Sequence, residues 1–513
     1  MNNIIEKFKI IASEYEDDKD IIKKLENHVL IDIPELIMNW KKQEEELNKI
    51  SILKNNYITN FLMRDNEQYF YYKNENGKAC YYIKYDGVNY ILEDEDSIWH
   101  KIIVEIQTQY ESSSFANYKH SVAEEIIEQI NNNDLMTTIP ESITIQNIIT
   151  FLSPMLLKTK EEVKYFLATL GDCIFSKNED IIFYVSELAR DFITEIESYY
   201  KDFFGKPLYN NQYKFKYRGA DYDKSRIIMF KKTIINKEIW KNYIKNNFLN
   251  LLVVSAHYSN RYGNSDIYIS KQSNDLQNKI FYLKNNTKQE IINEFKSRML
   301  INCDSSTETI NEKNMYFLWK IFCDSKNIPV IIYKNDFINL LKNELRFEED
   351  QQSFTFIKSD YLNPAKKFNK FWEQEMTMDE EIDEEYELSE ICELYNIWLE
   401  DGKKQITIKE YQLKNLILYF QPNVKLEGKY LYNLHCRLWN KKKDISECLK
   451  NKFNKVLDKD ITILQAYKSY CAYGDQNNFV NIVSKRYFMK YIGKIIPQQY
   501  MKNNNILLDY WNQ

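Results

Sequence analysis

Leu318-Trp319-Lys320-Ile321-Phe322 and Leu394-Tyr395-Asn396-Ile397-Trp398 begin two copies of one pattern in the second half of the chain. Each stretch has the apolar spacing of an amphipathic helix, and each is followed by a polar break, a second helical pattern and a short alternating stretch. Helix, turn, helix and hairpin is the order of a winged-helix unit, which contacts nucleic acid or protein with its second helix or its hairpin. The sequence therefore predicts two winged-helix-like units, at residues 311–372 and 388–440.

The rest of the chain is predicted to be mainly helical. From Gln68 to Glu93 the apolar period changes from helical to alternating, and Asp86-Gly87 is a strong hairpin signal. Residues 161–170 predict an amphipathic helix that ends at Gly171. With 513 residues the chain is too long for one core. We expect a multi-domain protein that is mainly α with small β-hairpins, of the α+β class.

The predicted organisation has seven parts. They are an N-terminal helical segment at residues 1–60, a small three-stranded hairpin domain plus a helix at 61–120, a central helical domain with a basic-aromatic strand region at 121–310, the first winged-helix-like unit at 311–372, an acidic linker at 373–387, the second unit at 388–440, and C-terminal helices at 441–513. The linker assignment rests on a run of acidic residues without a base.

Composition excludes several classes of function. Lysine and arginine total 69 against 75 aspartates and glutamates, so contact with nucleic acid requires a local basic patch. The sequence has no GxxxxGK[ST] phosphate loop, and its eight cysteines form no CxxC pair. No apolar run is long enough to span a bilayer. We expect no cofactor, no metal, no membrane contact, and a binding protein rather than an enzyme.

The stretch from Lys214 to Lys232 is the strongest local candidate for a nucleic-acid interface. If it is a strand, alternation places Lys214, Lys216 and Arg218 on one face and aromatic rings on the other. An ordinary amphipathic edge strand, with lysines that guard against aggregation, fits the same pattern. With the lysines of the two units, the predicted nucleic-acid-binding residues are Lys214, Lys216, Arg218, Arg226, Lys334, Lys409 and Lys414.

Two further motifs carry alternative hypotheses. Tyr57, Leu62 and Met63 match the Tyr-x4-Leu-hydrophobic pattern of helical peptides that dock on cap-binding translation factors, which would make them a partner-binding site. His257, Arg261 and Asp266 lie within ten residues and would form a catalytic group only if the fold brought their side chains together.

The block Glu161-Glu162-Val163-Lys164-Tyr165-Phe166-Leu167-Ala168-Thr169-Leu170-Gly171-Asp172, supported by Trp99-His100 and residues 256–260, resembles uncharacterised proteins of mimivirus-like nucleocytoplasmic giant viruses. More distantly, the order of elements is similar to that of viral D5-type primase-helicases. Where such a helicase has its phosphate loop, residues 182–190 contain neither glycines nor a P-loop lysine. The resemblance thus implies that ATPase activity has been lost and binding retained, in the viral factory of the host cytoplasm or in the virion, without secretion.

These observations lead to one main hypothesis and two alternatives. The first is a non-enzymatic nucleic-acid-associated protein in viral replication or expression, with DNA or RNA and other viral or host proteins as partners. The second is a protein-interaction scaffold, for example in viral translation initiation. The third is a degenerate relative of the primase-helicases.

Overall fold

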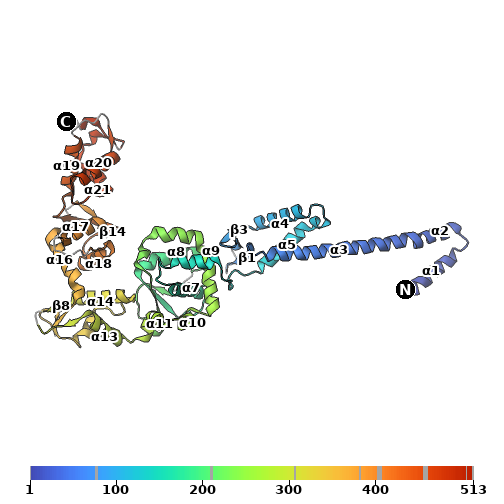
Figure 1. Ribbon diagram of the computed structural model, residues 1–513, viewed down its shortest axis with the longest axis horizontal. Helices are drawn as coiled ribbons and strands as arrows, with labels where there is room; N and C mark the ends of the chain where they lie inside the picture. Colours follow the sequence, from blue (N-terminus) through green and yellow to red (C-terminus); the bar gives the residue numbers. More distant parts are fainter. Residues whose placement is uncertain are drawn as a thin grey trace. The chain divides into compact units, whose positions relative to one another are not determined.

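The computed structural model describes residues 2–74, 79–207, 212–305, 308–379, 383–400, 407–453, 460–503 and 505–510. The chain divides into two compact units, one of Met1–Ile291 with Cys323–Ile331 and one of Ile292–Phe322 with Ile332–Gln513. Both are mainly helical and contain small sheets of two or three strands, which confirms the predicted fold class (Figure 1).

The first unit begins with helices that have few buried residues. Their bounds are α1 Asn2–Glu14, α2 Lys19–Asn27, a π-helical turn His28–Asp32, and α3 Ile33–Leu62. Pro34 lies in the first turn of α3, where its missing N–H costs no helical hydrogen bond. Only the last two turns of α3 have buried residues (Tyr57, Ile58 and Phe61), and these join a small core with α4 (Glu95–Gln109) and α5 (Lys119–Asn131).

The predicted three-stranded hairpin domain is an antiparallel sheet of β1 (Gln68–Lys73), β2 (Cys80–Tyr85) and β3 (Tyr90–Glu93). Asp86-Gly87 forms the second turn, as predicted. Gly87 has a φ of 92°, and a side-chain oxygen of Asp86 accepts the N–H groups of Val88 and Asn89. The first turn, at residues 75–78, lies outside the described residues.

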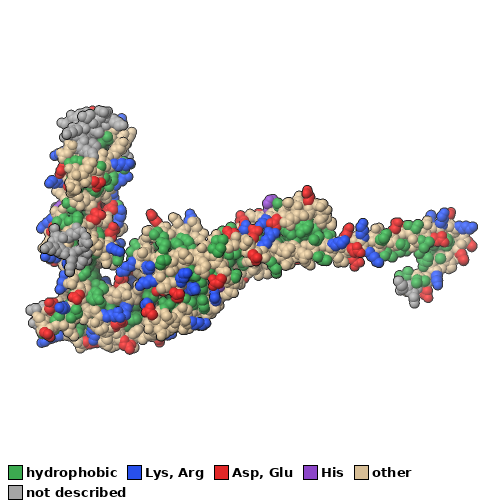
Figure 2. Space-filling model, viewed as in Figure 1, with side chains coloured by type: hydrophobic (Ala, Val, Ile, Leu, Met, Phe, Trp, Pro, Cys, Tyr) green, Lys and Arg blue, Asp and Glu red, His purple; other side chains and the backbone are tan. Residues whose placement is uncertain are grey.

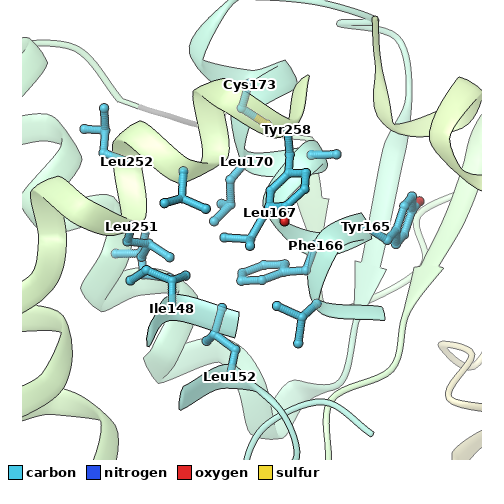
Figure 3. Packing of buried hydrophobic residues seen from close by; sticks show 14 of the residues in the cluster. Ile148, Leu152, Tyr165, Phe166, Leu167, Leu170, Cys173, Leu251, Leu252 and Tyr258 are labelled. Atoms are coloured by element: carbon cyan, nitrogen blue, oxygen red, sulfur yellow. The ribbon is translucent and has the colours of Figure 1, made fainter. Parts of the chain in front are cut away.

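The main core of the first unit is built by α6 (Ile143–Leu152), α7 (Lys160–Ile174) and α9 (Lys237–Tyr262). Figure 3 shows side chains of these helices packed together, among them Leu152, Leu167 and Leu251. The prediction that α7 ends at Gly171 is wrong, because the helix continues to Ile174. Gly171 instead faces α9, where a Cβ atom would lie 2.2 Å from the Ser255 carbonyl oxygen. The glycine therefore permits the close approach of the two helices.

A parallel sheet with the order β5-β4-β6 completes this core, formed by β4 (Ile182–Val185), β5 (Tyr213–Lys214) and β6 (Ser225–Ile228). Helix α8 (Arg190–Phe204) connects β4 to β5, as parallel pairing requires a crossover. The remaining helices of this unit are α10 Ser265–Ser270, α11 Asn274–Ile280 and α12 Tyr282–Asn285.

Residues 288–506 contain three copies of one topology, which we call modules 1, 2 and 3. They belong to the second unit except for residues 288–291 and 323–331, which belong to the first. Each has a helix, a short strand, two helices and a hairpin, and the first strand pairs with the last strand of the hairpin. Module 1 comprises α13 Lys288–Met299, β8 Thr309–Asn311, α14 Glu312–Lys326, α15 Lys334–Lys342, β9 Phe347–Glu348 and β10 Ser353–Thr355. Module 2 comprises α16 Asn363–Glu375, β13 Glu385–Glu387, α17 Leu388–Glu400, α18 Glu410–Phe420, β14 Leu426–Glu427 and β15 Tyr430–Tyr432. Module 3 comprises α19 Lys441–Phe453, β17 Ile461–Thr462, α20 Ile463–Gln476, α21 Lys485–Ile495, β18 Met501–Lys502 and β19 Asn505–Ile506.

Modules 1 and 2 overlap the units predicted at 311–372 and 388–440 but begin earlier, with α13 and α16, so residues 363–372 lie in module 2 rather than in the first predicted unit. The third copy lies in the region predicted to be only C-terminal helices. The eighth residue of the first helix after the strand is a buried aromatic residue in every module: Trp319, Tyr395 and Tyr470. In modules 1 and 2 leucine precedes it, but Ser469 takes that place in module 3. The apolar signature of the repeat is therefore weaker there.

Modules 1 and 2 each have an additional pair of strands. These are β7 (Ile301–Asn302) with β11 (Ile357–Lys358), and β12 (Met376–Met378) with β16 (Leu434–Cys436). The region 373–387, predicted as an acidic linker, therefore contains the end of α16 and the strands β12 and β13, while Glu380, Glu381 and Ile382 lie outside the described residues. Several of its carboxylates form ion pairs with basic side chains. Glu385, for example, pairs with Arg486 and Lys490.

Candidate nucleic-acid interface

The basic-aromatic stretch of the first unit is a strand only at its beginning. Strand β5 ends at Lys214, so Lys216 and Arg218 lie in the following loop rather than on a strand face as predicted. Lys214 is half-buried, whereas Lys216 and Arg218 are exposed. The Lys216 ammonium is 3.9 Å from a carboxylate oxygen of Glu187. These residues present two exposed cations, not a continuous basic face.

Arg226 does not belong to an exposed interface. It lies on β6 and is 3% exposed, and its guanidinium donates to both carboxylate oxygens of Asp266 at 2.7–3.2 Å. It also donates to the carbonyl oxygens of Asp223 and Ser225, and it lies over the ring of Phe281. The prediction that Arg226 binds nucleic acid is therefore wrong, because its donors are used inside the fold.

The three predicted lysines of the second unit lie on or next to the last helices of modules 1 and 2. Lys334 is exposed at the start of α15, Lys409 is exposed immediately before α18, and Lys414 is half-buried on α18. The predicted residues thus fall into one group in each compact unit, and within the second unit they are divided between modules 1 and 2.

Helix α18 of module 2 packs against module 1. The Tyr419 hydroxyl donates to the Lys313 carbonyl oxygen at 2.7 Å, and the Lys313 ammonium donates to the Phe420 carbonyl oxygen at 3.2 Å. The ring of Phe317 contacts the rings of Tyr419 and Phe420, with centroid distances of 5.0 and 4.9 Å. The C-terminal end of α18 is consequently an intermodule contact.

Module 3 is joined to module 2 by a buried ion pair. The Lys441 ammonium, with no exposed surface, donates to Glu390 at 2.5 Å and to the Glu385 carbonyl oxygen at 2.8 Å. Glu390 also accepts the N–H of Ser484 in module 3. Burial raises the pKa of Glu390 and lowers that of Lys441, while their mutual attraction opposes both shifts.

Aromatic rings surround the same ammonium. Tyr386 lies 3.9 Å, Tyr487 4.6 Å and Trp439 4.9 Å from the Lys441 nitrogen, measured to the ring centroids. These cation–π contacts come from both modules and add to the ion pair. The beginning of α21 is thereby fixed on module 2.

The basic residues of the second unit are concentrated in module 3. Residues 441–506 contain thirteen lysines and arginines against five acids, whereas residues 363–436 contain nine against fifteen. The exposed lysines of module 3 that have no carboxylate within 4 Å among the described residues are Lys443, Lys450, Lys468, Lys485 and Lys502. Figure 2 shows lysine and arginine side chains along modules 2 and 3, next to acidic ones.

Two lysines of this set share one side of a helix. Lys443 and Lys450 are seven residues apart on α19, a spacing of two turns, and α19 packs against α20. The sequence prediction missed these residues because it read 441–513 as generic helices. The available signal was the local charge balance, which departs from that of the whole chain.

The proposed docking motif is incorporated into the core of the first unit. Tyr57 is 4% exposed, its ring lies 6.3 Å from those of Phe61, Tyr110 and Phe115, and its hydroxyl donates to Glu105. Leu62 is half-buried and Met63 is exposed. A peptide motif of this kind must present its tyrosine and leucine to a partner, and Tyr57 faces inward.

Replacement of Tyr57 by phenylalanine is expected to act on stability. The variant leaves Glu105 with its ion pairs to Arg64 and Lys101, and we expect a loss of about 1 kcal/mol in the free energy of unfolding. Hydrogen exchange in α3 and α4 measures this effect. Recovery of a cap-binding factor in a pull-down is expected to be the same for both proteins, and a selective loss with Tyr57→Phe would contradict this assignment.

The residues of the catalytic hypothesis each have a separate structural partner. His257, buried within α9, accepts the N–H of Ile139 with Nδ1, and burial lowers its pKa. Arg261 pairs with Glu141, and Asp266 pairs with Arg226. No hydrogen bond or ion pair links any two of these three side chains among the described residues, so the structure gives no support to a catalytic group here.

A ligand pocket and a metal site are two further kinds of binding site. A hollow of about 720 Å³ lies between the β1–β3 sheet and residues 137–143, with Phe70, Tyr85 and Tyr90 in its wall. None of the described residues in its wall is a lysine or arginine, which gives no support to a phosphate ligand. Among the described residues no three His, Cys, Asp or Glu side chains are grouped so that they could hold a metal ion.

Two comparisons with known proteins found no match. The chain matches no protein-family profile and no curated protein. In the described part of the chain, no helix combines the length and the apolar character needed to cross a bilayer.

Proposed function

We propose that the chain is a non-enzymatic nucleic-acid-associated protein whose modules are winged-helix units, and that module 3 contacts the phosphate backbone. The observation that carries the proposal is the excess of thirteen bases over five acids in module 3 of a chain with a net charge of −6. A local positive field of this kind is the electrostatic requirement for binding nucleic acid.

The contact is proposed to involve the exposed lysines of α19 rather than a recognition helix. The end of α18 contacts module 1, and the beginning of α21 is fixed on module 2. A helix held in this way is not free to enter the major groove, which is how winged-helix proteins read bases. We therefore expect backbone contacts, with little preference for sequence and a strong dependence on salt.

Charge reversal on α19 tests the proposal. Lys443→Glu with Lys450→Glu should weaken binding to labelled duplex and single-stranded DNA and RNA. It should also lower the magnitude of the slope of log K against log salt by about 2, since each lost phosphate contact contributes about 0.9 for a duplex. Fluorescence polarisation at several salt concentrations measures both quantities.

The matched control reverses the charge of two lysines in the first unit. Lys7→Glu with Lys9→Glu changes the net charge equally, and both residues are exposed on α1. This control should bind as the wild type does. Equal weakening by both double variants, or no binding by the wild type at low salt, would overturn the proposal. The viral setting in replication or expression rests on the sequence resemblance alone.

A protein-interaction scaffold is the second candidate, and the stacking of the modules favours it. Contacts such as Tyr419 with Lys313 show that module surfaces pack against one another within the chain, and a partner protein could be bound in the same way. If this is the function, affinity capture should recover the same protein partner with the wild type and with Lys443→Glu/Lys450→Glu, after nuclease treatment. Loss of the partner on nuclease treatment would count against it.

A further inference from the structure

A second cationic surface lies on α21, on the face turned toward the acidic segment of module 2. Arg486, Lys490 and Lys494 are spaced four residues apart, which places them on one side of the helix with about 5–6 Å between the Cβ atoms of successive members. Their partners are carboxylates. Arg486 Nε is 3.2 Å from Glu385, Lys490 is 2.9 Å from Asp383, and Lys494 also contacts Asp383.

The carboxylates on this face differ in how firmly they are held. Glu385 is 3% exposed and belongs to β13, which pairs with β15, so the sheet fixes it. Asp383 precedes the strand, and its side chain is 55% exposed. The two lysines that it contacts are also partly exposed, at 42% and 54%. An anion from solution can therefore reach these lysines if Asp383 moves aside.

We propose that Lys490 and Lys494 form a second phosphate-binding surface of module 3, which Asp383 covers in the free protein. The Asp383 carboxylate occupies the position of a backbone phosphate between two ammonium groups. This inference rests on the proposed function, because it assigns a second contact surface for the same nucleic acid. The chain's own acidic residue then competes with the ligand and lowers its affinity.

The competing charge persists across the physiological pH range. Hydrogen bonds from Lys494 and Lys490 lower the pKa of Asp383 to about 2. Protonation therefore does not release the two lysines near neutral pH, and a polyanion has to displace the carboxylate. Because the ion pairs are partly exposed, this displacement costs little compared with a buried pair.

The test removes the competing charge and leaves the lysines in place. Asp383→Asn should bind DNA or RNA several-fold more tightly than the wild type in fluorescence polarisation. The slope of log K against log salt should steepen by about 2 for a duplex, which corresponds to two additional phosphate contacts. In the Asp383→Asn background, Lys490→Gln with Lys494→Gln should reverse both changes.

The matched control is Glu427→Gln, which makes the same change of charge and frees Lys425 on the hairpin of module 2. If it steepens the slope as much as Asp383→Asn does, the effect is general electrostatics and the inference is overturned. Hydrogen exchange in α21 should be similar in wild type and Asp383→Asn, since the Lys441–Glu390 pair holds the helix. A large increase would mean that the variant has loosened the modules, which would also overturn it.

The outcomes separate this inference from the proposed function. If the wild type binds through Lys443 and Lys450 and Asp383→Asn leaves the slope unchanged, the α21 surface is wrong and the α19 surface stands. If only Asp383→Asn binds, the α21 surface stands and the α19 surface is wrong. If neither protein binds at low salt, both fail.

Discussion

Lys441→Met is expected to lower the free energy of unfolding of the second unit by about 3–5 kcal/mol, because it leaves the Glu390 charge buried without its partner. Lys441 has no exposed surface and Glu390 is 6% exposed, so water cannot replace the lost contact without opening the interface. Urea unfolding followed by hydrogen exchange of α17 and α21 measures the loss. Lys443→Met removes an exposed lysine of the same helix and should change stability by less than about 0.5 kcal/mol.

A second variant distinguishes loss of the ion pair from loss of packing. Lys441→Met combined with Glu390→Leu removes both charges and should recover much of the stability, since an apolar pair of similar volume is often as stable as a buried ion pair. If the double variant is less stable than Lys441→Met alone, the hydrogen bonds of Glu390 to Ser484 and Glu387 matter more than the ion pair.

The deficit of Lys441→Met should depend on pH. Burial raises the pKa of Glu390, and without the lysine the main interaction that opposes this effect is lost, while the N–H groups of Glu387 and Ser484 still oppose it. A carboxyl group whose pKa is higher in the folded than in the unfolded state loses stability as the pH rises between those two values. The difference in stability between wild type and Lys441→Met should therefore be smaller at pH 5 than at pH 8. A constant difference would contradict a buried charge at Glu390.

Gly171→Ala is the other substitution with a large expected effect. The added Cβ would lie 2.2 Å from the Ser255 carbonyl oxygen and 2.6 Å from the Ser259 Cβ. Backbone atoms of a packed helix cannot move aside as a flexible side chain can, so α7 and α9 must separate. We expect a loss of about 3 kcal/mol or more in the first unit, at the upper end of overpacking effects. Thermal unfolding and hydrogen exchange of α7 and α9 measure it.

Gly493→Ala is the control for this experiment. Gly493 also lies within a helix, but a Cβ there meets no atom within 4 Å. Alanine should therefore stabilise α21 by about 0.5–1 kcal/mol through its higher helix propensity. A Gly171→Ala variant as stable as the wild type would contradict the close contact between α7 and α9.

The repeat could be predicted from sequence where its signature is apolar and local. Trp319 and Tyr395 are each preceded by leucine and lie on amphipathic helices, and this pattern indicates the repeated helix pairs of modules 1 and 2 but not the helices α13 and α16 that begin them. Tyr470 occupies the equivalent position but follows a serine, so module 3 was read as helices only. Strands of two residues, such as β17 and β18, also leave little alternation to detect.

The candidate interface is harder to predict, because the sequence does not show whether a charged side chain is exposed or pairs with another residue inside the fold. Arg226 belongs to a basic stretch in the sequence, yet Asp266, forty residues later, pairs with it inside the fold. Tyr57 fits a docking pattern, yet its hydroxyl donates a hydrogen bond to Glu105 and neighbouring aromatic rings enclose its side chain. In both examples the decisive contact is distant along the chain, and no local pattern encodes it.

The buried cores of modules 2 and 3 belong to one continuous cluster of apolar residues. A recombinant fragment that stops at residue 440 would thus end inside a cooperative folding block, with the Glu390 carboxylate deprived of its counter-ion. The same topology is repeated three times, but module 2 or module 3 cannot be deleted or replaced alone without redesign of the core that they share. The modules share one topology, but modules 2 and 3 are not independently stable units.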